Sequence, residues 1–599
     1  MCRSTNHNAA PARMNYKLNN SAKAANQKGG DIAALKSLLP LLATEKKDLG
    51  IALVAIVLNA GTTLVAPVII AYAIDTYIQT KNFSGVLWSA GVLLLIYLVG
   101  LLASYTQTIR MGTVGRRVLY NLRNEIFTKL QQLPVAFFNQ NKVGDLISRI
   151  NNDTDRLNQF FAQALMQFVG NFFLIVGAGV FLVVLNVHLG LAALIPAFGV
   201  FVVTQLVSAW VKRKNLESLQ TLGSLSAEIQ ESLNNFKVIV AFNRLDYFRK
   251  KFNEVNANNV KTSIGAGIAN TIFTPIYTFA SSLAQLIVLA YGIALIQSGQ
   301  ITIGLLVGFF LYVNNFYTPL RQLANVWSSL QQALAALDRI SEVLALKSDM
   351  VIVPSQPRAS TSVLEFLQVS FRYPEGKDVL KHISFALEQG KTYAFVGPTG
   401  GGKTTTASLM ARLYDPTEGT ILLDGQDIRS YAAEERARKI GFILQEPFLF
   451  NGSLLDNIFY GNADYVKSSN EERLTALQVS GLGELLTHFE QGLDTQIQTS
   501  GDTISLGQRQ LIAFVRAVLR KPELLILDEA TANIDTVTEQ LLEQALEKLP
   551  KKTTKVIIAH RLNTIENADE IFFVNGGEIT PAGSLEKAVE LLMHGKRQT

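Results

Sequence analysis

Six apolar stretches, each long enough to cross a lipid bilayer, constrain the fold of this chain more than any other feature. They cover about residues 49–78, 86–108, 161–185, 189–211, 269–296 and 303–316. A bilayer core requires about 20 apolar residues in a helix, and a helix satisfies every backbone N–H and C=O internally. The stretches therefore predict a membrane domain of six helices, the last of which grades into a polar helix.

The composition fits a membrane protein. Of 599 residues, 48% are hydrophobic and only 17% are charged, which is a low charged share for a soluble protein. The formal charge of +6 would also suit a nucleic-acid-binding protein, but Lys and Arg held on the cytoplasmic side explain it better, and we expect no nucleic acid partner. The single cysteine, Cys2, excludes a disulfide within the chain and a multi-cysteine metal site.

Short connections poor in Lys and Arg alternate with long basic ones, which include residues 110–156 and 212–261. The positive-inside bias places the long connections and both termini of this multi-pass chain on the cytoplasmic side. We expect the membrane to be the cytoplasmic (inner) membrane of the cell. Apolar residues recur at helical spacing in the long connections, which predicts helical hairpins extending beyond the membrane. Phe137, Phe138 and Phe236 fall at the hairpin tips. Solvated tips are one interpretation, and docking on a partner surface is the other.

Changes in composition divide the chain into four predicted parts. Residues 1–31 form a basic tail without an apolar run, which predicts disorder, and residues 32–346 hold the six helices. Residues 347–361 contain prolines that interrupt the periodicity and predict a linker. In residues 362–599 strands alternate with helices, which predicts an α/β domain.

A glycine-rich loop stands near the start of the α/β part. Residues 397–404 read G-P-T-G-G-G-K-T and follow the apolar run 393–396, which fits strand, phosphate loop and helix. In such a loop backbone N–H groups and the following helix N-terminus face an anion, the lysine adds a full charge, and the hydroxyl of Thr404 can hold Mg²⁺. A structural glycine turn is the alternative, but eight positions in register favour a nucleoside triphosphate site. The candidate residues are Gly397, Pro398, Thr399, Gly400, Gly401, Gly402, Lys403, Thr404 and Thr405.

A second apolar run, residues 524–527, ends in Asp528 and Glu529. Parallel sheets place ligands at the carboxyl ends of their strands, so Asp528 is a candidate to hold Mg²⁺ through water. Glu529 is then free to orient or deprotonate the attacking water. His560 follows the apolar run 556–559 and could contact the γ-phosphate, although a lone histidine at a strand end is more often structural. Together these residues predict an ATPase.

The segment 501–510 reads G-D-T-I-S-L-G-Q-R-Q and stands before the acidic run. It closely resembles the L-S-G-G-Q-R-Q signature of the ABC transporter family. The resemblance implies that Tyr373 stacks on adenine, that Gln445 is a catalytic residue and Mg²⁺ ligand, and that His560 is the switch histidine. It further implies nucleotide contacts by Ser505, Gly507, Gln508 and Asp535. Residues 137–149 and 302–344 look like the first intracellular loop and the last helix of the exporter type.

The resemblance implies an exporter-type half-transporter of the multidrug or lipid exporter kind, with a six-helix membrane domain fused to a P-loop nucleotide-binding domain. Two chains, identical or related, would enclose two molecules of ATP with Mg²⁺, and their closure would drive alternating access. The membrane stretches carry amides and tyrosines but no central Lys or Arg, which predicts hydrophobic or amphiphilic cargo. An importer of a chelate or vitamin and an ATP-gated, channel-like regulatory protein are the alternatives.

Two positions depart from the family pattern. Leu506 replaces the usual glycine of the signature, and Thr499 and Ser500 stand where the exporters usually carry a glutamate. A side chain at position 506 could crowd the approach of backbone to phosphate. Tolerated drift is one interpretation, and pairing with a non-identical partner is the other.

Overall fold

The computed structural model describes residues 15–18, 39–354, 357–374, 376–486, 489, 492–498, 504–528, 536–558, 568–583 and 585–594. The chain forms two compact units. The first contains Met1–Leu18, Gln132–Lys142 and Leu346–Thr599, and the second contains Asn19–Gln131 and Val143–Ala345. The predicted domain boundaries at 31, 346 and 361 stay predictions.

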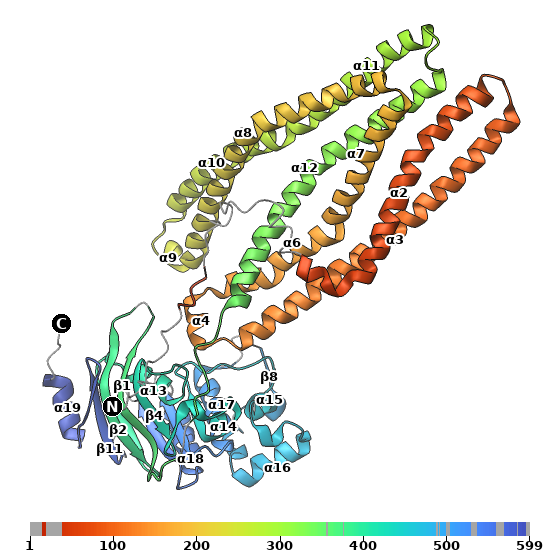
Figure 1. The fold of residues 1–599 in the computed structure, drawn as a ribbon. Coiled ribbons are helices and arrows are strands. Elements are labelled where there is room, and N and C mark those ends of the chain that lie inside the picture. The colour runs from red at the N-terminus through yellow and green to blue at the C-terminus, as the bar shows by residue number, and fades with distance from the viewer. Residues whose placement is uncertain are drawn as a thin grey trace, which may run out of the picture. The chain divides into compact units, whose positions relative to one another are not determined.

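All regular elements of the second unit, within the part that the structure describes, are helices (Figure 1). Its elements are η2 (Leu39–Glu45), α2 (Lys46–Ala73), η3 (Ile74–Ile78), α3 (Phe83–Gln131), α5 (Val143–Ser148), η4 (Arg149–Asp153), α6 (Thr154–Gln159), η5 (Phe160–Ala164), α7 (Leu165–Leu185), α8 (Val187–Asn234), α9 (Phe236–Ala241), α10 (Leu245–Thr271), α11 (Phe273–Gln297) and α12 (Ile303–Ala345). Among the described residues six helical segments are long and apolar enough to cross a membrane, which confirms the six predicted helices. With 49 residues, α3 is about 73 Å long, more than twice the thickness of a bilayer core.

Buried contacts hold the membrane helices together. The helix α2 packs on α3, α8 packs on α10 and α11, and α12 packs on α2, α7 and α11.

A proline interrupts the hydrogen bonding of α2. Because Pro67 lacks an N–H group, the carbonyl of Thr63 has lost its usual partner within the helix. The side chain of Asn315 in α12 donates to this carbonyl over 3.3 Å. An amide in α12 thereby satisfies a carbonyl that the proline exposes.

A buried ionic cluster joins the stem of the first hairpin to α12. Arg149, with a side chain only 1% exposed, pairs through Nε with Asp145 at 3.0 Å and through Nη1 with Glu342 at 2.9 Å. Arg339 pairs with Asp145 at 2.7 Å and with Asp153 at 3.2 Å. Two arginines thus offset much of the charge of three carboxylates, and within this cluster Arg149 and Asp153 are almost completely shielded from water.

The tip of the second hairpin carries an apolar surface. The short helix α9 lies between α8 and α10, which run side by side (Figure 1). Ile239 is buried, whereas Phe236, Val238, Val240 and Phe242 are exposed, Phe242 to 75%. A surface of this kind is typical of a docking site.

The first unit contains an α/β domain, as the sequence predicts. A six-stranded sheet has the order β12-β11-β3-β10-β9-β6, with β12 antiparallel at one edge and the others parallel, and a four-stranded antiparallel sheet has the order β2-β1-β4-β5. The strands are β1 (Ser362–Arg372), β2 (Asp378–Glu388), β3 (Thr392–Val396), β4 (Glu418–Leu423), β5 (Gln426–Asp427), β6 (Ile440–Ile443), β7 (Gly452–Ser453), β8 (Gln496–Ile497), β9 (Leu524–Asp528), β10 (Thr554–Ile558), β11 (Glu570–Asn575) and β12 (Glu578–Pro581). The helices are α4 (Val135–Gln140), α13 (Lys403–Met410), α14 (Ala433–Lys439), η6 (Ile428–Ser430), α15 (Leu454–Phe459), η7 (Ala463–Tyr465), α16 (Asn470–Ser480), η8 (Gly483–Leu486), η9 (Gly492–Asp494), α17 (Leu506–Leu519), α18 (Thr536–Glu547) and α19 (Leu585–His594).

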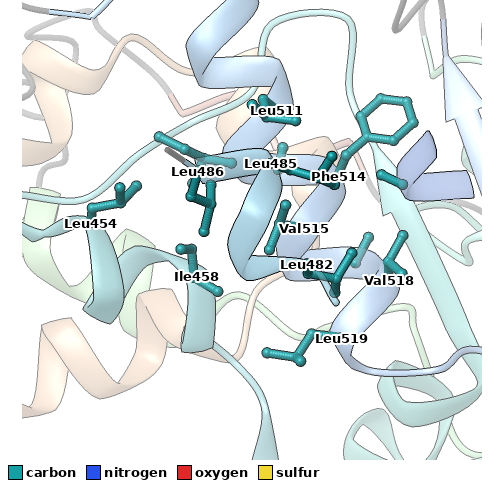
Figure 2. Packing of buried hydrophobic residues seen from close by; sticks show 14 of the residues in the cluster. Leu454, Ile458, Leu482, Leu485, Leu486, Leu511, Phe514, Val515, Val518 and Leu519 are labelled. Atoms are coloured by element: carbon teal, nitrogen blue, oxygen red, sulfur yellow. The ribbon is translucent and has the colours of Figure 1, made fainter. Parts of the chain in front are cut away.

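The helix α17 is anchored on most sides. Its apolar residues pack with those of α15 and η8 in one buried cluster, which includes Phe514, Val515, Leu454, Ile458 and Leu485 (Figure 2). It also contacts α18 and β6. Burial on this scale fixes the N-terminus of α17, where the signature residues stand.

Candidate functional site

The phosphate loop connects β3 to α13 and depends on its glycines. Gly397, Gly400 and Gly402 have φ values of +150°, +83° and +114°, which favour residues without a Cβ. A Cβ on Gly397 would also lie 2.0 Å from the carbonyl oxygen of Val574, so no side chain fits there. The residues that precede the loop, Ala394 to Val396, are buried in the sheet, and the loop therefore starts from a fixed point.

Lys403 closes over this loop. Its side chain is 5% exposed, and its Nζ donates to the carbonyls of Gly397 at 2.8 Å and Pro398 at 3.1 Å. The ammonium group thus lies across the loop whose N–H groups face an anion in proteins of this type. A bound phosphate would compete for the same ammonium protons.

Thr404 and Asp528 meet although they come from different segments of the chain. The Thr404 hydroxyl donates to Oδ1 of Asp528 over 3.3 Å, and Asp528, at the end of β9, is 4% exposed. A hydroxyl and a carboxylate are oxygen ligands that Mg²⁺ accepts. Among the described residues no group of three or more His, Cys, Asp or Glu could hold a metal. This donor set fits Mg²⁺, which binds through one or two protein oxygens together with phosphate and water.

The central strand of the sheet runs between the two parts of this site. In β10, Ile558 is paired with Asp528 on one side and with Phe395 on the other. His560, Glu529 and Asp535, three predicted site residues, lie outside the described residues. In sequence, Glu529 directly follows Asp528, and His560 comes two positions after Ile558.

Tyr373 lies beside the loop. Its hydroxyl is 3.2 Å from Oγ1 of Thr405, and its ring meets Phe371 and Tyr414 edge-on, with centroids 4.8 Å and 5.4 Å away. Tyr373 and Tyr414 line a cavity of about 520 Å³. The structure therefore brings together Tyr373, Thr405, the phosphate loop and Asp528.

The signature residues stand separately, at the N-terminus of α17. Ser505 caps the helix: its Oγ accepts from the N–H of Gln508 at 3.2 Å, and the Gln508 side chain accepts from the N–H of Ser505 at 3.0 Å. Gly507 is buried, and a Cβ there would lie 3.0 Å from Oγ1 of Thr538. Leu506 is the first residue of the helix and is half-buried. The capping box holds the exposed Ser505 at the positive end of α17.

Two residues that the sequence analysis did not single out connect α17 to the segment around Gln445. Gln510 is 1% exposed and donates from Nε2 to the Gln445 carbonyl at 3.4 Å. Arg516 donates to the carbonyls of Asn457 at 2.7 Å and Phe448 at 3.2 Å, and burial lowers its pKa. In the sequence, Gln510 and Arg516 stand out as polar residues among the apolar residues of α17, and this pattern could have identified them.

Comparison with known proteins agrees with this arrangement. A family model described as the ABC transporter transmembrane region matches residues 49–320, and one described as ABC transporter matches residues 380–532. The chain is 35% identical to an ABC transporter ATP-binding protein of Bacillus subtilis over 95% of this chain and 93% of that protein. It is 32% identical to an ATP-dependent lipid A-core flippase of Mannheimia succiniciproducens (93% and 95%). It is also 31% identical to a fatty acid ABC transporter ATP-binding/permease protein of Mycobacterium tuberculosis (84% and 80%).

Proposed function

Because this chain belongs to the ABC transporter family, we propose that it is an exporter-type half-transporter that moves a hydrophobic or amphiphilic molecule, a lipid or drug-like compound, out across the cytoplasmic membrane. One observation carries the proposal: six membrane-spanning helices and a phosphate loop facing a buried carboxylate occur in the same chain. The chain couples ATP hydrolysis to transport and is a multi-pass membrane protein. The basic connections favour cytoplasmic N- and C-termini.

In the proposed ATP site, the loop N–H groups and Lys403 hold the β- and γ-phosphates, and the ring of Tyr373 receives the adenine. Thr404, Asp528 and Gln445 would hold Mg²⁺, which offsets the negative charge of the phosphates. Glu529 acts as the base towards water, and His560 contacts the γ-phosphate. The bonds from Lys403 to the carbonyls of the phosphate loop and the 3.3 Å contact between Thr404 and Asp528 support the roles of Lys403, Thr404 and Asp528.

A second half-transporter completes the assembly in this proposal. The exposed Ser505, the half-buried Gln508 and the buried Gly507 form the start of α17, where backbone N–H groups and the helix dipole favour the γ-phosphate held by a facing chain. We assign Asp535 to the same interface on the family resemblance alone. Each chain also has a groove of about 260 Å³, lined by the exposed aromatic residues Phe448, Phe450 and Tyr460. We propose that the apolar face of α9 from one chain lies in this groove of its partner.

The membrane unit supports an amphiphilic cargo. A cavity of about 460 Å³ lies among α2, α3 and α12. Its polar lining consists of neutral groups, namely Asn59, Thr62, Thr63, Tyr97, Ser104, Asn314 and Asn315, next to apolar residues such as Pro67, Ile70 and Leu101. Uncharged hydrogen-bonding groups beside apolar surface suit a molecule with a polar head and an apolar body. The names of the relatives, which include fatty acid and lipid A-core carriers, point in the same direction.

Transport into sealed vesicles tests the proposal. The purified chain is reconstituted with its nucleotide-binding domains facing outwards, and ATP-dependent accumulation of a fluorescent lipid and a lipophilic dye is measured, with Lys403→Ala as the inactive control. We expect accumulation that requires ATP and stops in the variant. ATP consumption without accumulation, or movement out of the vesicle, would contradict export. Mass measurement of the same particle establishes whether the chain pairs with itself.

A further inference from the structure

The segment Asn15–Leu18, which we call the strap, is built into the first unit although it falls in the predicted disordered tail. The side chain of Tyr16 is fully buried and that of Leu18 is 5% exposed. The strap, the short helix α4 and the α/β domain all belong to one compact unit. A tail segment that buries a tyrosine completely has a defined partner surface.

One side of the strap binds the start of the α/β domain. The Tyr16 hydroxyl donates to Oδ1 of Asp349 at 2.7 Å and accepts from the N–H of Asp349 at 2.8 Å. Burial, together with the hydrogen bond to the Asp349 carboxylate, raises the pKa of Tyr16, so the phenol stays protonated and can keep donating. A phenylalanine would fill the same space but make neither bond.

The other side binds α4 and the residue after it. The N–H of Tyr16 donates to Oε1 of Gln140 at 3.0 Å. The Asn141 side chain accepts from the N–H of Leu18 at 3.0 Å and donates to the carbonyl of Tyr16 at 2.9 Å, so it pairs with the strap backbone much as a neighbouring strand would. The ring of Phe137, which is fully buried, meets the ring of Tyr16 edge-on at 6.4 Å. For Phe137, one of the hairpin-tip aromatics, the sequence left open a solvated tip or docking on a partner surface; in the structure it is buried, and the strap is part of its cover.

The strap also borders the nucleotide side of the domain. Tyr16, Pro134 and Ala136 line the same cavity of about 520 Å³ as Tyr373. At another point α4 is held by Asn139, which donates to the hydroxyl of Tyr414 at 2.6 Å, and Tyr414 lines this cavity as well. Residues of the strap, of α4 and the proposed adenine-stacking residue thus line the same cavity.

We propose that the strap positions α4 on the nucleotide-binding domain of its own chain, with Tyr16 as the positioning residue, and thereby sets how much cargo moves for each ATP hydrolysed. The helix α4 is the tip between α3 and α5, so a force from the nucleotide-binding domain reaches the membrane helices through it. The hydrogen bonds of Tyr16 and Leu18 go to Asp349, Gln140 and Asn141, which belong neither to the phosphate loop nor to β9, so we expect loss of the strap to weaken transmission more than hydrolysis. This inference rests on the proposed transport function.

Hydrogen exchange combined with transport tests the strap in the full-length protein in lipid. The backbone amides of Tyr16 and Leu18 should exchange slowly in the wild type and rapidly in Tyr16→Ala and Asn141→Ala. Cargo moved per ATP should fall by about three- to tenfold in both variants, while kcat at saturating ATP changes by less than about twofold. Tyr16→Phe should lie between the wild type and Tyr16→Ala, and Lys142→Ala, an exposed neighbour on the same loop, should behave as the wild type.

Fast exchange of both amides in the wild type would overturn the claim that the strap is bound to the first unit. An unchanged ratio of cargo to ATP in Tyr16→Ala, or a parallel loss of hydrolysis and transport, would overturn its positioning role. If the wild type itself moves no cargo, the proposed function fails and the positioning role fails with it. That result is distinguishable, because the exchange measurement reports on the strap whether or not cargo moves.

Discussion

The hydroxyl of Thr404 and the carboxylate of Asp528 lie 3.3 Å apart, so the start of α13 and the end of β9 meet at one point. The contact joins residues 124 positions apart in the sequence. It explains why a phosphate loop alone is not a site: the second oxygen ligand comes from a strand two places away in the sheet.

Replacing Asp528 with asparagine tests this pair. Asp528→Asn keeps the shape and removes the negative charge, so we expect affinity for ATP in the presence of Mg²⁺ to fall and hydrolysis to decrease by about 100-fold. Binding is measured with Mg²⁺ and again with a chelator. Without Mg²⁺ the two proteins should bind ATP about equally, and an equal loss under both conditions would mean that Asp528 does not act through the metal.

Glu529→Gln tests the proposed base. The variant should bind Mg-ATP as the wild type does and lose about 10²- to 10⁴-fold in hydrolysis, because the amide cannot accept the proton of water. Nucleotide binding and phosphate release are measured on the same preparation. Glu543→Gln, an exposed carboxylate on α18, is the matched control and should keep normal turnover. Normal turnover in Glu529→Gln would remove this residue from the base role.

Leu506→Gly tests the unusual signature. Position 506 is the first residue of α17, and removing its side chain lets a facing phosphate approach the helix start more closely, so ATPase activity of the purified chain should rise by about two- to tenfold. Gly507→Ala is the opposing control, because its Cβ would lie 3.0 Å from Oγ1 of Thr538, and it should lower activity. No gain in Leu506→Gly would favour a non-identical partner that supplies the productive signature.

Cysteine cross-linking tests the proposed contact between partners. With Cys2, the single cysteine, replaced by serine, Val238→Cys on α9 and Phe448→Cys in the groove are combined in one chain. We expect oxidation to give a species of twice the mass of the chain. Each single-cysteine variant should stay mostly monomeric under denaturing conditions. A disulfide that forms only within one chain would contradict docking on the partner.

Lys439→Met should destabilise the nucleotide-binding domain. Nζ of Lys439 bonds Asp424 at 2.7 Å and Glu523 at 3.0 Å, which ties α14 to the residues beside β4 and β9. Burial alone would lower the pKa of Lys439, but these bonds outweigh it and the pKa is raised. The free energy of unfolding should fall by about 1–3 kcal/mol, which is measured as a lower midpoint of thermal unfolding.

The raised pKa also fixes the pH dependence of this loss. A lysine whose pKa is raised in the folded state contributes its full stabilisation of the fold at any pH below its ordinary pKa of 10.5. This contribution is lost only as the pH rises through the higher pKa of the folded state. The difference between the wild type and Lys439→Met should therefore be equal at about pH 6.5 and about pH 8.5. A difference that shrinks across that interval would show that Lys439 titrates earlier than its contacts imply.

Local sequence signals explain which features could be predicted. The glycines of residues 397–402 and the six apolar stretches determine structure through residues close in sequence, and both appear as predicted. The strap could not be predicted, because its stability comes from Asp349, Gln140 and Asn141, which are far away in sequence, whereas its own composition is that of a tail. The connection between Gln510 and Gln445 has the same character, since only the tertiary fold brings α17 to the end of β6.

The ionic cluster around Arg149 has a mechanical consequence. Separating Arg149 from Asp145 and Glu342 would strand a buried charge at a cost of about 3–5 kcal/mol. The hairpin stem and α12 should therefore travel as a single rigid body through the cycle, so that spin labels on α5 and the end of α12 keep one distance with and without nucleotide. Bending must then occur elsewhere in the helices, and the proline-interrupted α2 is the first place to look for it.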